Sequence, residues 1–327
     1  MEYLSIYNDY IPGFISDIAA APEMQRLKKV GMDCGCEYTS FEIFKKIIPC
    51  SRYVHSIGAA LITWHFSEDE KATIAALLHD IASPVFAHTV DFLNGDYETQ
   101  ESTEDGTALI IRSSKEIVSC LSGLKIKPEE VSDYHMYPIA DNNSPRLSAD
   151  RLEYTLSNGI NFNICLADDA ARMYRDLCVT KNEDNEDEIA FTTIDVAEEF
   201  TYLSLQCSYI YVSPEDRFAM QKLADVLKYG IECGVISRKD LYGTEDDVIT
   251  KLVNSIDTSV VWNRFRALSK MVPPDEKPGE ARVISSKKRY IDPLVKDKGR
   301  ISSISEGCRD SIEKFLSQDF SIPVAGI

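Results

Sequence analysis

The residues of this chain most able to do chemistry are histidines and aspartates. His79 and Asp80 are adjacent within the apolar stretch AALLHDIASPVFAHTV (75–90), and the chain has only five histidines. An ionised carboxylate in apolar surroundings must be paired, hydrogen-bonded or bound to a metal, because burying it alone is too unfavourable. The pair is therefore either a hydrogen-bonded core pair or part of a metal site.

His55 and Asp150 complete a candidate set of metal ligands. His55 lies in SRYVHSIGAALI (51–62), where its i+4 and i+7 neighbours are apolar, and Asp150 lies in LSADRLEYTL (147–156). Three predicted helices would then present two imidazoles and two carboxylates. Mixed nitrogen and oxygen ligands suit a divalent ion such as Mn, Fe, Ni or Mg better than a closed thiolate zinc site. Four protein ligands leave room for water, which becomes a nucleophile at neutral pH when a metal binds it.

The order H…HD…D resembles the HD superfamily of metal-dependent phosphohydrolases. The sequence motifs are most similar to those of the branch that contains bacterial dGTP triphosphohydrolases and SAM-and-HD-domain dNTP triphosphohydrolases. The resemblance rests on phrases that span nearly the whole chain in the expected order, namely MQRLKKVG (24–31), SRYVHSIGAA (51–60), AALLHDIASPVFAH (75–88), SADRLEYTL (148–156), SYIYVSPEDRFAMQKLADVLKYGIECG (208–234) and KKRYIDPLV (287–295). It implies a mostly α fold, with an HD-domain helical core and small β-hairpin accessories, and a homo-oligomer.

The resemblance also implies which residues hold the metal and act in catalysis. The ligands would be His55, His79, Asp80 and Asp150, and Asp80 would help to position the attacking water. His88 matches a histidine near the transferred phosphate and would protonate the leaving oxygen. The alternative for His88 is helix packing.

Three further residues match positions that contact the substrate in the family. Arg52 matches an arginine that contacts phosphate, Arg151 matches a basic residue near the phosphates, and Tyr154 matches a tyrosine that lines the pocket. The alternatives are a surface charge for Arg52, a solvated helix residue for Arg151 and core packing for Tyr154.

The chain also departs from the family pattern. Ala82–Val85 replaces a Gly-His-Gly-Pro-like run, so one histidine near the metal is missing. The family's downstream His-Glu pair matches Thr103 and Glu104, so Glu104 remains a catalytic candidate while threonine replaces the histidine. Met32 falls where a pocket glutamine is expected, and Leu203 falls where triphosphate enzymes hold a basic residue. The metal site is thus complete, but fewer residues are left for a triphosphate.

The composition narrows the class of protein. The 327 residues include 53 acidic and 35 basic ones, a net charge of −18, and 44 % are hydrophobic. A generic nucleic-acid surface needs excess Lys and Arg, so the charge argues against one, but it permits a small anionic ligand in a locally basic pocket. No apolar run could span a bilayer, and MEYLSIYNDYIPGF (1–14) lacks a signal-peptide pattern. We therefore expect a cytoplasmic protein without membrane contact, whose nine cysteines are reduced.

Most segments carry the apolar period of a helix. We expect helices over Phe41–Ile48, Tyr53–Phe66, Glu70–Leu93, Thr107–Leu121, Leu147–Ser157, Leu166–Asp176, Ile194–Tyr211, Pro214–Cys233 and Thr244–Ser255. Asn158-Gly159 predicts a helix end, and Thr244 is the expected N-cap of the last helix.

Two segments interrupt the helical pattern. In 176–193, alternating apolar runs flank the acidic KNEDNEDE, which predicts a hairpin with a solvated tip. The Pro-rich MVPPDEKPGEA (271–281) is the best candidate boundary. We therefore expect an HD-type domain over 1–271, with its core near 50–235, and a small α+β extension over 282–327 packed on it.

The residues leave three functions open. The first is hydrolysis of a phosphate ester or anhydride in a nucleotide-like small molecule, by a dNTP triphosphohydrolase-like enzyme or a nucleotidase. Because few basic residues are evident, a monophosphate or a smaller substrate is a real possibility beside a dNTP. The second is a catalytically weak HD protein that binds a nucleotide or metal and acts as a sensor or partner-binding module, which the threonine at Thr103 favours. The third is a structural helical protein in which His79 and Asp80 form a core pair.

Overall fold

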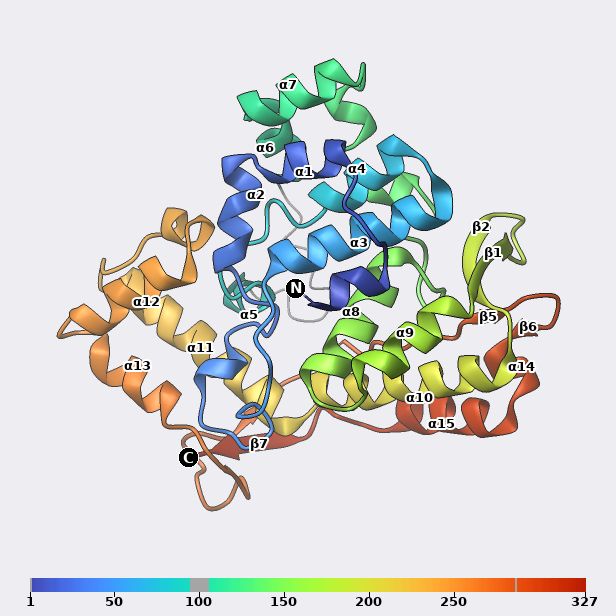
Figure 1. The fold of residues 1–327 in the computed structure, drawn as a ribbon. Helices are drawn as coiled ribbons and strands as arrows, with labels where there is room; N and C mark the ends of the chain where they lie inside the picture. The colour runs from blue at the N-terminus through green and yellow to red at the C-terminus, as the bar shows by residue number, and fades with distance from the viewer. Residues whose placement is uncertain (1, 95–105, 286) are drawn as a thin grey trace.

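Helices make up most of the protein in this computed structural model, which describes residues 2–94, 106–285 and 287–327 (Figure 1). The α-helices of these residues are α1 (Gly13–Ala19), α2 (Pro22–Arg26), α3 (Arg52–Ser67), α4 (Glu70–Leu78), α5 (Thr89–Asn94), α6 (Thr107–Ser113), α7 (Lys115–Gly123), α8 (Ala149–Asn161), α9 (Ala167–Arg175), α10 (Ile194–Tyr211), α11 (Pro214–Glu232), α12 (Glu245–Asn254), α13 (Ser259–Arg266), α14 (Ile301–Ile304) and α15 (Glu306–Ser317). Short 3-10 helices are η1 (Glu2–Ile6), η2 (Leu27–Lys29), η3 (Cys36–Tyr38), η4 (Pro128–Glu130), η5 (Tyr134–Met136) and η6 (Arg238–Tyr242). The predicted mostly α fold with small β elements is confirmed.

Short strands of the described ranges form two small sheets. They are β1 (Leu177–Lys181), β2 (Asp187–Phe191), β3 (Met271–Val272), β4 (Arg282–Val283), β5 (Leu294–Val295), β6 (Gly299–Arg300) and β7 (Pro323–Gly326). In the first sheet, β1 and β2 form the predicted antiparallel hairpin, β5 runs parallel to β2, and β6 pairs with β5. In the second, β7 lies between β3 and β4. The division into two domains stays a prediction.

The helix α3 lies in the middle of the molecule and contacts α4 and α8 (Figure 1). Two glycines allow the close approach of these helices and of α10. A Cβ on Gly58 of α3 would lie 2.6 Å from Cγ of Glu153 on α8, and a Cβ on Gly159 of α8 would lie 2.9 Å from a methyl carbon of Leu203 on α10. Real Cβ atoms do not approach so closely, so any other residue at either position requires the neighbouring side chain to shift.

The predicted helix end at Asn158-Gly159 is therefore wrong. α8 continues to Asn161, and Gly159 serves packing against α10 instead of ending the helix. The predicted helix over Phe41–Ile48 is also wrong, since residues 42–46 form turns. Tertiary contacts decide both cases against the local pattern.

The segment that carries His79 is not the continuous helix that its apolar pattern predicts. α4 ends at Leu78, with His79 as its C-cap, and α5 begins only at Thr89. The guanidinium of Arg26 donates to the backbone carbonyls of Ile81 at 3.0 Å and Ser83 at 2.8 Å, which stabilises a non-helical loop between the helices. The histidine and the aspartate after it thus lie where a helix meets a tight loop.

Other elements follow the predictions more closely. α3, α9, α10, α11 and α12 lie where expected, and the Thr244 side chain caps α12 by accepting from the amide of Asp247. The expected helix over Thr107–Leu121 is instead two helices, because Ser114 ends α6 and caps α7. None of the helices that the structure describes is both long and apolar enough to cross a membrane.

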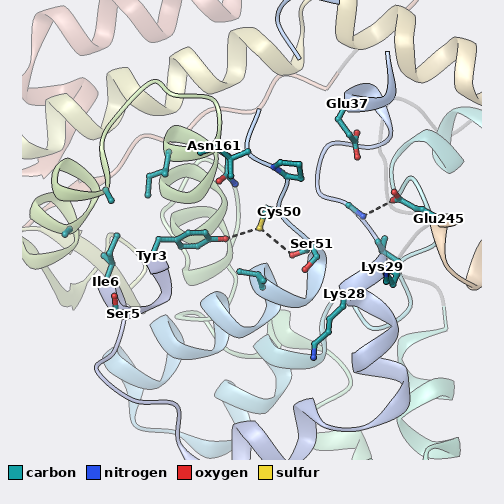
Figure 2. A pocket seen from close by; sticks show the side chains of 18 of the residues that line it. Tyr3, Ser5, Ile6, Lys28, Lys29, Glu37, Cys50, Ser51, Asn161 and Glu245 are labelled. Atoms are coloured by element: carbon teal, nitrogen blue, oxygen red, sulfur yellow. Dashed lines mark hydrogen bonds between the residues drawn. The ribbon is translucent and has the colours of Figure 1, made fainter. Parts of the chain in front are cut away.

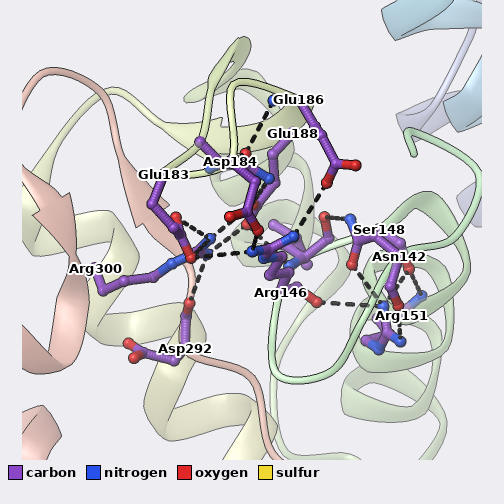
Figure 3. Close-up of polar contacts among 12 residues, drawn as sticks. Asn142, Arg146, Ser148, Arg151, Glu183, Asp184, Glu186, Glu188, Asp292 and Arg300 are labelled. Atoms are coloured by element: carbon purple, nitrogen blue, oxygen red, sulfur yellow. Dashed lines mark hydrogen bonds and ion pairs between the residues drawn. The ribbon is translucent and has the colours of Figure 1, made fainter.

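The acidic tip of the hairpin is held by two arginines (Figure 3). Arg300 donates to both oxygens of Glu188, at 2.5 and 2.7 Å, and also to Glu183. Arg146 pairs with Asp184 and, at 3.1 Å, with Glu186. The predicted solvated tip is wrong for Glu188, whose side chain is fully buried. The tip therefore joins β6 to the loop before α8.

We expect Gly58→Ala to lower the free energy of unfolding by about 1–3 kcal/mol, because the added methyl group must displace the buried Glu153 side chain that packs between α3 and α8. Denaturant unfolding measures this change. Gly123→Ala, at the end of α7 with no atom within 4 Å of the new Cβ, is the matched control and should change stability by less than about 1 kcal/mol. Equal losses in both variants would contradict the close packing of α3 and α8.

Candidate metal centre

The four predicted metal ligands converge. The Nε2 atoms of His55 on α3 and His79 at the end of α4 are 3.3 Å apart. Oδ1 of Asp150, in the first turn of α8, lies 3.0 Å and 3.6 Å from these two nitrogens. Oδ2 of Asp80 lies 3.9 Å and 3.6 Å from them. Ligand atoms about 2.1 Å from one ion are separated by roughly 3–4 Å, so His55, His79 and Asp80 form a group that can hold one divalent cation. Asp150 approaches both histidines within the same range.

The second ring nitrogen of each histidine is held by an acceptor. His55 Nδ1 lies 2.5 Å from Oε2 of the fully buried Glu153, and His79 Nδ1 donates to the carbonyl of Ala76 at 2.6 Å. A proton on Nδ1 leaves the Nε2 lone pair directed at the shared site, as around metal-bound histidines. Sequence reasoning missed Glu153, although it lies three residues after Asp150 and hence one helical turn away.

Burial and neighbouring charges determine the protonation of the site. Burial lowers the pKa of His55, but the carboxylates of Glu153 and Asp150 outweigh this effect and raise it to about 10. Burial raises the pKa of Asp150, but the two histidines outweigh it and lower the value to about 2. Arg52 and the histidines likewise hold the pKa of Asp80 well below its usual range despite burial. Without a metal, the protein therefore keeps both carboxylates charged and a proton on His55.

Arg52 lies against the aspartate of the HD pair. Its Nη1 donates to both carboxylate oxygens of Asp80 at 2.7 Å, and Ser83 Oγ donates to Oδ1 at 2.7 Å. Only 7 % of Arg52 is exposed, so the alternative of a surface charge is excluded. Its contact with a phosphate stays a prediction. The residue lines the same cavity as the predicted metal ligands.

The chain ahead of Arg52 is fixed by backbone pairing. Gly31 and Ser51 form a bridge, and the amide of Arg52 donates to the carbonyl of Val30 at 2.9 Å. The amide of Gly31 also donates to Glu245 at 2.8 Å. These contacts determine where α3 begins and hence where Arg52 and the metal ligand one turn later lie.

A cavity of about 1180 Å³ adjoins this paired segment and contains none of the predicted metal ligands (Figure 2). Tyr3 and Cys50 meet across it, with 3.0 Å between the hydroxyl and the sulfur. Lys28, Glu37 and Glu245 also line it.

The candidate metal centre opens into a different cavity of about 740 Å³. This volume lies within the range of small-molecule sites. Tyr154, Tyr211 and Met32 contribute to its walls, so Tyr154 lies where a pocket residue was predicted. Leu203 lies instead between α8 and α10, 3 % exposed, and does not line this cavity.

His88 lines the same cavity and is oriented by a buried carboxylate. Its Nδ1 lies 2.9 Å from Oδ2 of Asp91, which is fully buried, while 28 % of the His88 side chain is exposed. Burial lowers the pKa of His88; Asp91 raises it, and Arg289 and Arg52 lower it further. A histidine held in this way can transfer a proton within the pocket. Asp91 was not predicted either.

Arg151 holds the loop that precedes α8 (Figure 3). Its guanidinium pairs with Asp141 at 3.0 Å and donates to Asn142 and to the Ser148 hydroxyl. The alternative of a solvated helix residue is therefore wrong, and the predicted phosphate contact stays a prediction. Thr103 and Glu104 lie outside the described residues.

Comparisons with known proteins support the fold. No protein-family model matches the chain. It is 26 % identical over 255 residues to the uncharacterized protein YdhJ of Bacillus subtilis (strain 168), a match that covers 77 % of this chain and 74 % of that protein. It is 26 % identical over 164 residues to the metal-dependent phosphohydrolase cns2 of Cordyceps militaris, a match that covers 49 % of this chain and 45 % of that protein.

A solved structure extends the likeness over nearly the whole chain. A phosphohydrolase from Bacteroides thetaiotaomicron VPI-5482 superposes with a TM-score of 0.63 at 15 % identity, over 97 % of this chain and 96 % of that one. At this identity the likeness establishes the fold alone. The predicted mostly α fold with small sheets is thereby confirmed.

We expect Glu153→Gln to weaken metal binding by about 10–100-fold, because the amide no longer holds His55 as a carboxylate does. Titration of the metal-free protein with Mn²⁺ measures the affinity. The matched control is Glu198→Gln on α10, a half-buried glutamate that accepts a hydrogen bond from Ser305 and contacts no predicted ligand. An unchanged affinity in Glu153→Gln would show that this carboxylate does not orient the ligand.

We expect metal binding near neutral pH to release about one proton per ion. The pKa of His55 is raised to about 10 without a metal, so a proton occupies the site and must leave. The apparent affinity should therefore rise with pH, by up to about tenfold per pH unit below that pKa. Calorimetric titration in two buffers of different ionisation enthalpy counts the protons. Identical heats in both buffers would contradict the protonated imidazole.

Proposed function

We propose that the protein is a metal-dependent phosphohydrolase that acts on a nucleotide-like phosphate ester or anhydride. One observation carries the proposal: His55, His79 and Asp80 form a group that can hold a metal ion, with Asp150 against both histidines, beside a ligand-sized cavity that Arg52 and His88 also line. The names of the Cordyceps relative and the Bacteroides structure support it. Membership of the HD superfamily, and of its dNTP triphosphohydrolase branch, is part of the proposal and rests on the ordered motifs.

The metal would be held by His55, His79, Asp80 and Asp150. A bound Mn, Fe, Ni or Mg ion supplies an activated water and polarises phosphoryl oxygens. Asp80 would position the attacking water through the metal that it holds, because Arg52 and Ser83 already account for three of its about four acceptor positions.

The remaining residues of the pocket would handle charge and protons. Arg52 neutralises negative charge on the phosphoryl oxygens. His88, held by Asp91 at 2.9 Å, donates a proton to the leaving oxygen. An anionic phosphate near His88 raises its pKa, which offsets the lowering by the two arginines and favours the protonated form that this step needs.

The pocket and the charge of the chain support a small-molecule substrate. The cavity of about 740 Å³ can hold a nucleotide, and Tyr154 and Tyr211 offer aromatic walls. The net charge of −18 opposes generic nucleic-acid binding. All nine cysteines are free, which supports our expectation that the protein acts in the cytoplasm. We also propose a homo-oligomer without membrane contact, as the family resemblance implies.

A catalytically weak metal- or nucleotide-binding sensor is the second candidate. It is favoured by the loop after Asp80, where Ala82, Ser83 and Pro84 offer no histidine. Where the family has a histidine near the metal, this chain has the Ser83 hydroxyl, which donates to Asp80. A sensor would bind the metal as the enzyme does but would turn nothing over.

We expect protein purified without chelator to contain about one divalent metal per chain and to release phosphate from members of a nucleotide panel. Asp80→Ala should lose the metal and slow phosphate release by more than about 100-fold, beyond the effect of outer-shell changes. His65→Ala, which removes an exposed histidine that stacks near Phe66 and Tyr174, should retain both properties. Metal content by mass spectrometry and a phosphate assay measure the two readouts.

Each outcome separates the candidates. Metal without turnover would favour the sensor. Absence of metal in wild type, even after Mn²⁺ or Ni²⁺ is added, would make the four residues a structural cluster and refute the hydrolase.

A further inference from the structure

The cavity beside the metal centre receives basic residues from a segment far along the chain. Lys287 and Arg289 line it together with residues of α3, α8 and the loop after α4. Neither residue was assigned a role from the sequence. On α10, where the family resemblance implies a basic residue, this chain has Leu203, which is buried between helices. Lys287 and Arg289 instead reach the cavity from a segment for which no phosphate contact was predicted.

The segment that carries Arg289 is anchored on both sides. Before it, the carbonyl of Ile284 accepts from Arg217 Nη1 at 2.6 Å, and both residues are buried. After it, the amide of Asp292 donates to the carbonyl of Pro145 at 2.9 Å. Figure 3 shows Asp292 beside Arg300 and close to the loop that Arg146 and Arg151 hold. The backbone at Arg289 is therefore placed by the core of the protein.

The electrostatic neighbours of Arg289 place it inside the cavity. Burial lowers the pKa of His88 and raises the pKa values of Tyr154 and Tyr211. The charge of Arg289 adds to the first shift and opposes the other two, and all three residues line the cavity. Arg52 also lowers the pKa of His88, so the proposed proton donor lies within the field of two guanidinium groups. A phosphate next to His88 would meet both.

The carboxyl groups of the cavity do not oppose an anion here. Asp80 is paired with Arg52, Asp150 with the protonated His55, and Asp141 with Arg151. Burial raises the pKa of the remaining two, Asp33 to about 7 and Asp216 to about 8. Both of these carboxyls are therefore protonated for much of the time at neutral pH.

We propose that Arg289, assisted by Lys287, binds a second anionic group of the substrate, next to the phosphoryl group held by Arg52 and the metal centre. A substrate with at least two anionic groups, such as one with two linked phosphates, fits this arrangement better than a simple monoester. Arginine suits the task because its planar fork binds phosphate oxygens in pairs. The identity of the first group as a phosphate rests on the proposed function; the anion site itself does not.

The binding test uses inorganic pyrophosphate on the full-length chain without metal, measured by calorimetry. We expect Arg289→Met to weaken binding at least about tenfold, and Arg289→Lys to weaken it less, because lysine keeps the charge and loses the fork. Lys288→Gln is the matched control: it removes the same charge one residue away, where the ammonium donates to the Leu316 carbonyl and does not line the cavity. It should bind as wild type does.

Thermal unfolding of each variant shows whether it is folded, and Arg289→Lys keeps the test valid if Arg289→Met is unstable. Pyrophosphate binding that is equal in wild type and both Arg289 variants, or absent in wild type, would overturn the inference.

A turnover test separates this inference from the proposed function. In the metal-loaded enzyme, Arg289→Met should raise KM for a nucleoside diphosphate by about tenfold or more and affect a nucleoside monophosphate less. Turnover with unchanged KM and kcat in the variant would leave the hydrolase standing and refute the anion site. Pyrophosphate binding that depends on Arg289, without turnover of any nucleotide, would support the anion site and refute the hydrolase.

Discussion

The constraint on which the rest of this structure depends is the burial of several charges at one point. Asp80 and Asp150 lie beside His55 and His79, and Arg52 pairs with Asp80. Isolated charges cannot be buried at this density, because each loses its hydration. The arrangement is stable only if every carboxylate has a positive or hydrogen-bonding partner, which means a proton on an imidazole or a cation in its place. A metal ion meets this need better than a proton, since it attracts all four groups at once.

The need to pair these buried charges explains features of the structure around them. Glu153 must reach His55, and a methyl group at Gly58 would prevent this. The chain leaves the helical path after His79, which places the Asp80 side chain beside the two histidines. Arg26 binds the backbone carbonyl groups of Ile81 and Ser83 that no longer take part in helical hydrogen bonds. The packing of α3, α4 and α8 is thus as close as it is because it positions ligands from all three.

The parts of the site that could be predicted are those encoded locally. His55, His79, Asp80 and Asp150 stand in recognisable phrases in a fixed order, so their convergence could be expected before any coordinates. Glu153 and Asp91 lie one turn from predicted residues and could have been found by asking what holds each ring nitrogen.

The parts that could not be predicted depend on contacts between distant segments. The end of α4 is decided by Arg26, which is more than 50 residues away, against an apolar pattern that favours a longer helix. Gly159 was misinterpreted because a glycine after asparagine is a local stop signal, whereas close contact with Leu203 is invisible in the sequence. The position of Arg289 depends on the bond between Asp292 and Pro145, which no local pattern encodes.

The pairing of Arg52 with Asp80 bears on whether the site can hold a metal at all. Nη1 donates to both oxygens at 2.7 Å, and an arginine that filled the carboxylate would exclude a cation. A carboxylate, however, has about four acceptor positions. Arg52 and Ser83 account for three of them, and the oxygen that Ser83 leaves open, Oδ2, is the one within 3.6–3.9 Å of the histidine nitrogens. The arginine therefore orients the aspartate toward the metal position without occupying it.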